Sequence, residues 1–205
     1  MNSNEGESAL VPMREAQAPL FPLTNFFLYP GSLVPLHIFE PRYRQLVTDL
    51  LDGSGRLVMG TVPDEHRLEL PGAPPIYPVA GLGEIARHEK LPDGRFLIWV
   101  FGLARVRVRE VASEQPYRRV AYLPLQEIPV LHWRRDELQQ NLEAAVKERC
   151  KDIPELPEEL AITCLTDILT QRLQLSSADA MRLYAEPDVE QRALAALELH
   201  AQRGG

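Results

Sequence analysis

Three arginines alternate with apolar residues in the stretch L-A-R-V-R-V-R-E-V, which runs from Leu103 to Val111. In an extended strand successive side chains point to opposite faces, so this spacing places Arg105, Arg107 and Arg109 together on one face. A row of guanidinium groups could bind acidic peptide segments or RNA phosphates. Charged side chains also protect a sheet edge from pairing with other chains, so the row has a structural explanation as well.

A second group of candidate residues lies in the sequence F-E-P-R-Y, which contains Phe39, Glu40, Arg42 and Tyr43. Proline suits the first turn of a helix, so a helix should begin at Pro41. As a functional site, this corner would form the rim of a groove that accepts a polypeptide segment. The structural alternative is that Glu40 caps the helix, Tyr43 packs under the neighbouring strands and Arg42 pairs with a nearby carboxylate.

The sequence lacks the motifs of common catalytic and nucleotide-binding sites. It contains no G-x-x-x-x-G-K-[ST] loop to hold phosphates and no G-x-S-x-G turn to present a nucleophilic serine. None of its three lysines follows a serine in the arrangement of a proteolytic Ser-Lys dyad, and its five histidines are scattered. We therefore expect a protein that is not an enzyme and that carries no cofactor.

Cysteine content and overall charge restrict the expected partners. Cys150 and Cys164 have no C-x-x-C motif and no second Cys/His pair nearby, so we expect neither a metal site nor a disulfide. The formal net charge of −7 argues against nucleic acid as the main partner. With 45% apolar and 25% charged residues, the 205-residue chain has the composition of a soluble globular protein. No apolar run approaches the ~20 residues of a membrane span, so we expect a cytoplasmic protein.

The F-E-P-R-Y corner must be positioned by the proline-rich stretch from Ala18 to Tyr43. Its five prolines exclude a long helix, so its apolar runs predict short strands. Pro30-Gly31 predicts a type II turn between them, because glycine supplies the positive φ that this turn requires. The helix after Pro41 should end at Asp52-Gly53, with glycine as a left-handed cap. Helical spacing predicts that its buried face contains Tyr43, Leu46, Val47, Leu50 and Leu51.

The arginine row must be positioned by further strands. A loop rich in proline and charge is expected over residues 63–78, and Asp93-Gly94 predicts a hairpin turn. Phe96–Phe101 is apolar at every position, which predicts a strand buried on both faces, followed by the separate, half-buried arginine strand. Further strands are expected over Leu57–Val62, Val79–Arg87 and Tyr117–Leu125.

From Trp133 the spacing of apolar residues is helical to the end of the chain. Pro154 to Pro157 should break the first helix from the second, and Ser176 with Asp179 has the spacing of a capping box. Short connections predict a compact antiparallel bundle of three or four helices. The expected helical segments are Leu138–Cys150, Leu160–Leu173, Ser176–Ala185 and a last one that begins at Pro187-Asp188.

Several linked motifs together resemble the N-terminal substrate-binding domain of Lon-type ATP-dependent proteases, in its free-standing, bacterial-type form. They are P-L-F-P-L, Y-P-G, P-L-x-I-F-E-P-R-Y, G-L-G-E-I-A-R, L-P-D-G-R and F-G-L-A-R-V-R-V. The resemblance implies an α+β fold: a small PUA-like pseudo-β-barrel with one packed helix, followed by the helical bundle. We expect a disordered leader at 1–17, the barrel-like part at 18–128 and the bundle at 129–205.

Because the motifs of the ATPase and the protease are absent, the resemblance implies a recognition part alone. We expect it to bind unfolded or peptide-like protein segments, as a monomer or weak dimer, in a groove between barrel and bundle or at a strand edge. It could serve as an adaptor for a protease or chaperone. The alternative is a PUA-like RNA-binding module that uses Arg105, Arg107 and Arg109. A ligand-dependent role like that of relatives with a zinc-bearing domain is set aside, since the four cysteines of that domain are missing.

Overall fold

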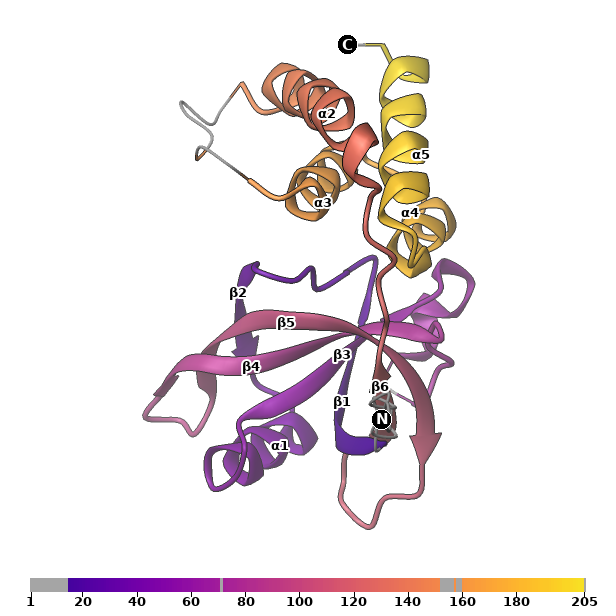
Figure 1. The fold of residues 1–205 in the computed structure, drawn as a ribbon. Coiled ribbons are helices and arrows are strands. Elements are labelled where there is room, and N and C mark those ends of the chain that lie inside the picture. Colours follow the sequence, from indigo (N-terminus) through magenta and orange to yellow (C-terminus); the bar gives the residue numbers. More distant parts are fainter. Residues whose placement is uncertain (1–14, 71, 152–156, 158–159, 205) are drawn as a thin grey trace, which may run out of the picture.

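The computed structural model describes residues 15–70, 72–151, 157 and 160–204, which form a barrel-like lobe and a helical lobe (Figure 1). Residues 1–14 of the expected leader lie outside this range, as does most of the predicted break between Pro154 and Pro157. Ala16 and Gln17, which were expected in the leader, instead belong to the first strand. No helix in the described part of the chain is long and apolar enough to cross a membrane.

The barrel-like lobe is built on one six-stranded sheet in the order β2-β5-β4-β3-β1-β6. Strand β5 also pairs with β6, so five strands close into a ring and β2 continues the sheet outside it (Figure 1). Among the six strands that the structure describes, only β1 and β3 run parallel to each other. The strands are β1 (Ala16–Thr24), β2 (Leu33–Ile38), β3 (Arg56–Val62), β4 (Val79–Lys90), β5 (Phe96–Val111) and β6 (Arg119–Pro124).

Strand β5 is one continuous element of 16 residues, where the sequence predicted two separate strands. A bulge in its pairing with β4 lies between Gly102 and Ala104. At Gly102 the backbone of Tyr29 approaches so closely that a Cβ atom would overlap the Tyr29 carbonyl oxygen. The prediction that Phe96–Phe101 is buried on both faces is wrong. Phe96, Ile98 and Val100 are buried, but the alternate side chains are partly accessible and Phe101 is 40% exposed.

The two predicted turns are confirmed, and the predicted cap of the helix that begins at Pro41 is corrected. Gly31 has a φ of +79°, and the Ser32 N–H donates to the Tyr29 carbonyl oxygen at 3.2 Å, as a type II turn requires. The hairpin between β4 and β5 turns at Gly94 with a φ of +81°. The expected left-handed cap at Gly53 is wrong, because Gly55 adopts that conformation and donates to the Leu50 carbonyl oxygen at 3.1 Å.

Helix α1 (Pro41–Leu51) closes one side of the barrel, as Figure 1 shows. Its apolar face, predicted from helical spacing, is confirmed for Tyr43, Leu46, Val47 and Leu50, while Leu51 is 37% exposed. This face packs into the largest core of the barrel. The core also contains Phe21, Leu28, Ile38, Leu57, Met59, Phe96, Ile98 and Val100.

The described residues of the helical lobe form four α-helices, and three of them, α2, α3 and α5, pack on one another. Ser176 and Asp188 accept hydrogen bonds from the backbone N–H groups of Asp179 and Gln191, which confirms both predicted helix starts. Cys150 and Cys164 are free thiols, as the sequence indicated. The helices are α2 (Arg135–Arg149), α3 (Ile162–Arg172), α4 (Ser177–Ala185) and α5 (Val189–Gln202).

The two lobes are joined by specific contacts, mainly through α4 and the start of α5. The Tyr184 hydroxyl donates to the Leu28 carbonyl oxygen at 2.6 Å. In the segment after β6, the Ile128 N–H donates to the Pro187 carbonyl oxygen at 2.9 Å and the Val189 N–H donates back to the Ile128 carbonyl oxygen. These bonds fix the bundle against one end of the barrel.

Candidate functional site

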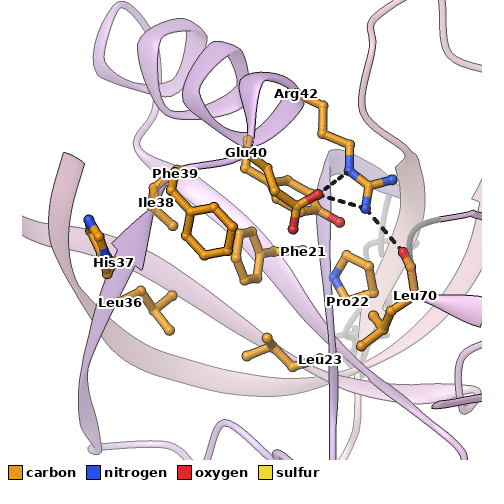
Figure 2. A pocket seen from close by; sticks show the side chains of 11 residues that line it. Phe21, Pro22, Leu23, Leu36, His37, Ile38, Phe39, Glu40, Arg42 and Leu70 are labelled. Carbon is orange, nitrogen blue, oxygen red and sulfur yellow. Dashed lines mark hydrogen bonds and ion pairs between the residues drawn. The ribbon is translucent and has the colours of Figure 1, made fainter. Parts of the chain in front are cut away.

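The four candidate residues of the F-E-P-R-Y corner, all but Pro41, line one groove, which has a volume of about 320 Å³. Figure 2 shows the groove between the second half of β1, the end of β2 and the start of α1. Leu70, from the proline-rich loop, completes the wall. The lining residues outside the corner are Phe21, Pro22, Leu23, Leu36, His37, Ile38 and Leu70.

The groove lies where the sheet is open. Among the described residues β2 pairs only with β5, and β1 pairs with β6 only through Ala16–Pro19. Each strand therefore borders the groove with a stretch that has no strand neighbour on one side. Unpaired N–H and C=O groups at such an edge are a template for an added strand.

The free edge of β2 offers a defined set of backbone groups. The Gly102 N–H donates to the Ser32 carbonyl oxygen at 2.9 Å, which fixes the phase of the antiparallel ladder. Because hydrogen-bonded pairs alternate along such a ladder, residues 34, 36 and 38 face β5, while Leu33, Pro35 and His37 turn their backbone groups away from it. Proline has no N–H, so this edge presents three acceptors and two donors.

The walls of the groove are mainly apolar. Phe21 is buried and packs against the Tyr43 ring, with 4.5 Å between ring centroids. Phe39 is 60% exposed, and its ring centroid lies 6.0 Å from that of His37. An exposed aromatic side chain beside a buried apolar wall is a suitable site for another apolar side chain.

Arg42 connects three parts of the groove rim. Its guanidinium binds the Glu40 carboxylate at 3.0 Å and donates to the Leu70 carbonyl oxygen at 3.1 Å (Figure 2). It also lies 4.6 Å from the centre of the Tyr43 ring. The predicted local pairing of Arg42 is thus confirmed. The predicted capping by Glu40 is wrong, because its side chain makes no cap hydrogen bond and turns to Arg42 instead. Burial raises the pKa of the Tyr43 hydroxyl, and Arg42 opposes this effect.

The three arginines of β5 do not form a common exposed surface. Arg105 is only 4% exposed, since the helical lobe covers it, and it donates to the Glu127 carboxylate and the Tyr184 carbonyl oxygen. Arg107 and Arg109 lie farther along the strand and are exposed, and Arg109 pairs with Glu15 at 3.0 Å. The sequence correctly predicted that side chains alternate between the two faces of this strand. It did not predict that the helical lobe covers Arg105.

A charged cluster at the joint of the two lobes, buried except for Glu127, was missed by the sequence analysis. Arg105 and Arg192 both bind the Glu127 carboxylate, and each lies 3.9 Å from the Asp167 carboxylate. Burial raises the pKa of Asp167 to about 6, although both arginines oppose this. The four residues are far apart in the sequence and form no motif, so nothing in their spacing could have indicated the cluster. Among the described residues, no group of three or more His, Cys, Asp or Glu side chains could hold a metal ion.

Residues 17–202 match the family model of the ATP-dependent protease La (LON) substrate-binding domain. The chain is 27% identical to the Lon protease of Dictyoglomus thermophilum over 182 residues, which are 85% of this chain and 23% of that protein. It is 28% identical to the Lon protease of Anaeromyxobacter dehalogenans over 189 residues, or 91% of this chain and 22% of that protein. The chain therefore spans less than a quarter of the length of these relatives.

Solved structures show the same fold. The N-terminal domain of the Mycobacterium avium complex Lon protease superposes with a TM-score of 0.69 at 14% identity, over 92% of this chain and all of that one. A Lon N-terminal domain protein from Xanthomonas campestris superposes with a TM-score of 0.63 at 22% identity, over 89% of this chain and 98% of that one. The fold expected from the sequence motifs, a small partly closed barrel with helices, is thereby confirmed.

Proposed function

Because the chain belongs to the family of the ATP-dependent protease La (LON) substrate-binding domain, we propose that it binds exposed or unfolded polypeptide segments and does not transform them. The observation that carries this proposal is the apolar groove beside the unpaired edge of β2. An edge supplies hydrogen bonds that do not depend on the client's sequence, and a neighbouring pocket supplies selectivity.

In this mechanism the client segment is extended and adds to β2. The N–H groups of Leu33 and His37 donate to the client, and the carbonyl oxygens of Leu33, Pro35 and His37 accept from it. A client side chain that points to the inner face enters the groove between Phe21 and Leu36, with Phe39 at its rim. Burial of an apolar side chain there contributes about 1.5 to 3 kcal/mol, less whatever remains exposed.

The same proposal extends to the protein's partners. The printed sequence has no P-loop and no Ser-Lys dyad, so these residues carry neither the motif for ATP-driven unfolding nor the one for cleavage. We propose that the chain presents clients as an adaptor to a separate protease. The RNA-binding alternative loses its main support, since Arg105 is buried and Arg109 is paired with Glu15.

The test is fluorescence anisotropy with a labelled, reduced and alkylated protein that cannot refold, and with a single-stranded RNA as parallel ligand. We expect binding of the unfolded protein that changes little between about 50 and about 200 mM salt, because apolar contacts are not screened. Phe39→Ser should weaken it about fivefold or more. Leu68→Ser is the matched control, since Leu68 is 85% exposed and does not line the groove. No binding of the unfolded protein, or equal effects of both substitutions, would contradict the proposal.

A further inference from the structure

A second apolar surface lies on the outer face of the sheet, close to the groove. We call it the outer patch and define it by Leu33, Pro35, Trp99 and Phe101. Leu33 lies opposite Phe101 and Pro35 opposite Trp99 in the pairing of β2 with β5. Leu33 is 56% and Phe101 40% exposed, whereas most side chains on the inner face of the same strands are buried.

The border of the outer patch carries charges of both signs. The Arg87 guanidinium lies 4.8 Å from the centre of the Trp99 ring and holds one side of it. Glu84 lies opposite Phe101 on β4 and is paired with Arg56 at 3.1 Å. Such a balanced border does not favour a charged ligand of either sign, so the patch suits an uncharged apolar side chain.

The free edge of β2 separates the outer patch from the groove. The inward side chains of Leu36 and Ile38 line the groove, and the outward side chains of Leu33 and Pro35 belong to the patch. In a strand added to this edge, successive side chains would alternate between the two sides, because the side-chain period of a strand is two. The patch is therefore continuous with the binding site proposed above.

We propose that one extended client segment occupies both sites at once, with one apolar side chain in the groove and a second on the outer patch. A client residue opposite Leu36 or Ile38 points into the groove, and one opposite Leu33 covers the patch. The two anchors are then separated by three or five positions. An even separation places both on the same side of the added strand and leaves one site empty. This spacing rule rests on the proposed function of the groove.

The test uses short, labelled, uncharged peptides in a threonine- and serine-rich host. One peptide carries a single leucine, and the others carry two leucines separated by three, four or five positions. Anisotropy should show that a separation of three or five binds about fivefold or more tightly than a separation of four, as expected for burial of one further partly covered leucine. The peptide with a separation of four should bind like the single-leucine peptide, apart from a statistical factor of about two.

Substitutions on the outer patch make the test specific. Phe101→Ser, and separately Leu33→Ser, should remove the preference for odd separations, so that the peptides bind with similar affinity. Leu194→Ser on α5 is the matched control, because Leu194 is 38% exposed and lies on the other lobe, and it should keep the preference. Far-UV circular dichroism and thermal melts check that each variant is folded.

The possible failures are distinguishable. If all peptides bind alike while Phe39→Ser still weakens them, the spacing rule is overturned and the groove remains the binding site. If the preference for odd separations of the two leucines survives both outer-patch substitutions, the second leucine binds elsewhere and the proposal is overturned as well. If no peptide and no unfolded protein binds, the proposed function fails together with the spacing rule.

Discussion

The Tyr184 hydroxyl and the Leu28 carbonyl oxygen, 156 positions apart in the sequence, are joined by a buried hydrogen bond of 2.6 Å. Tyr184 lies on α4 and is 1% exposed, and burial raises the pKa of its hydroxyl. Leu28 lies in the segment between β1, which lines the groove through Leu23, and the turn into β2. The bond therefore ties the helical lobe to the segment from which the proposed binding edge starts.

Tyr184→Phe should destabilise the protein by about 1 to 3 kcal/mol, because it leaves the buried Leu28 carbonyl oxygen without its donor. Chemical denaturation followed by circular dichroism measures this difference in the free energy of unfolding. Tyr122→Phe on β6 is the control, since Tyr122 is only half-buried and its change should stay within about 0.5 kcal/mol. Equal effects of the two substitutions would contradict a special role for the Tyr184 bond.

Arg105→Ala should cost about 2 to 4 kcal/mol, because it leaves the Glu127 and Asp167 carboxylates with Arg192 as their one remaining cationic partner in the cluster. Arg107→Ala removes an exposed arginine from the same face of β5 and should change stability by less than about 0.5 kcal/mol. The two unfolding curves can be compared directly. Similar losses for both variants would show that the burial of Arg105 has no energetic consequence.

Asp167 should make the stability depend on pH. Burial raises its pKa from 3.8 to about 6 in the folded protein, despite Arg105 and Arg192, while Glu127 acts in the same direction as burial. The folded state thus holds a proton that the unfolded state has released. Its contribution to the free energy of unfolding is fully present below pH 3.8 and is lost as the pH rises through about 6.

Asp167→Asn should remove this part of the pH dependence. A difference of about two units between the folded-state and unfolded-state pKa of Asp167 corresponds to at most about 3 kcal/mol. The free energy of unfolding of the wild type should therefore fall by up to that amount, relative to the variant, between about pH 4 and pH 7. Other carboxyl groups titrate in both proteins and cancel in the difference. If the free energy of unfolding changed with pH in the same way for the wild type and the variant, the raised pKa of Asp167 would be contradicted.

Arg42→Ala should release the proline-rich loop from the groove rim, because Arg42 holds the carbonyl oxygens of Leu70 and Gly72. We expect faster trypsin cleavage after Arg67 in this loop and a loss of stability of about 1 kcal/mol. Arg56→Ala is the control, since it breaks the exposed pair with Glu84, outside the groove. An unchanged cleavage rate in Arg42→Ala would mean that other contacts hold the loop.

Local patterns in the sequence predicted the elements well. The spacing of Tyr43, Leu46, Val47 and Leu50 indicated the buried face of α1, and Pro30-Gly31 indicated the turn that the structure contains. These features depend on residues that are neighbours along the chain. The corner residues Phe39, Glu40, Arg42 and Tyr43 also proved to line one groove, because they belong to one short segment at the start of α1.

Features that depend on distant contacts were not predictable in the same way. Arg105 has the same local pattern as Arg107, and only the packing of the helical lobe makes one buried and the other exposed. Phe101 is the last residue of an unbroken apolar run, yet its side chain is 40% exposed, and hydrophobicity alone could not indicate this. Leu70 reaches the groove through a loop whose path no sequence pattern specified.

The most direct test of strand addition at β2 is amide hydrogen exchange, measured residue by residue by NMR with and without a bound two-leucine peptide. We predict that the amides of Leu33 and His37 become strongly protected on binding, because they would donate to the added strand. The amides of Leu36 and Ile38, which already face β5, should change little. Protection that leaves Leu33 and His37 unchanged and appears instead between barrel and bundle, around Phe27 and Ala180, would contradict the account.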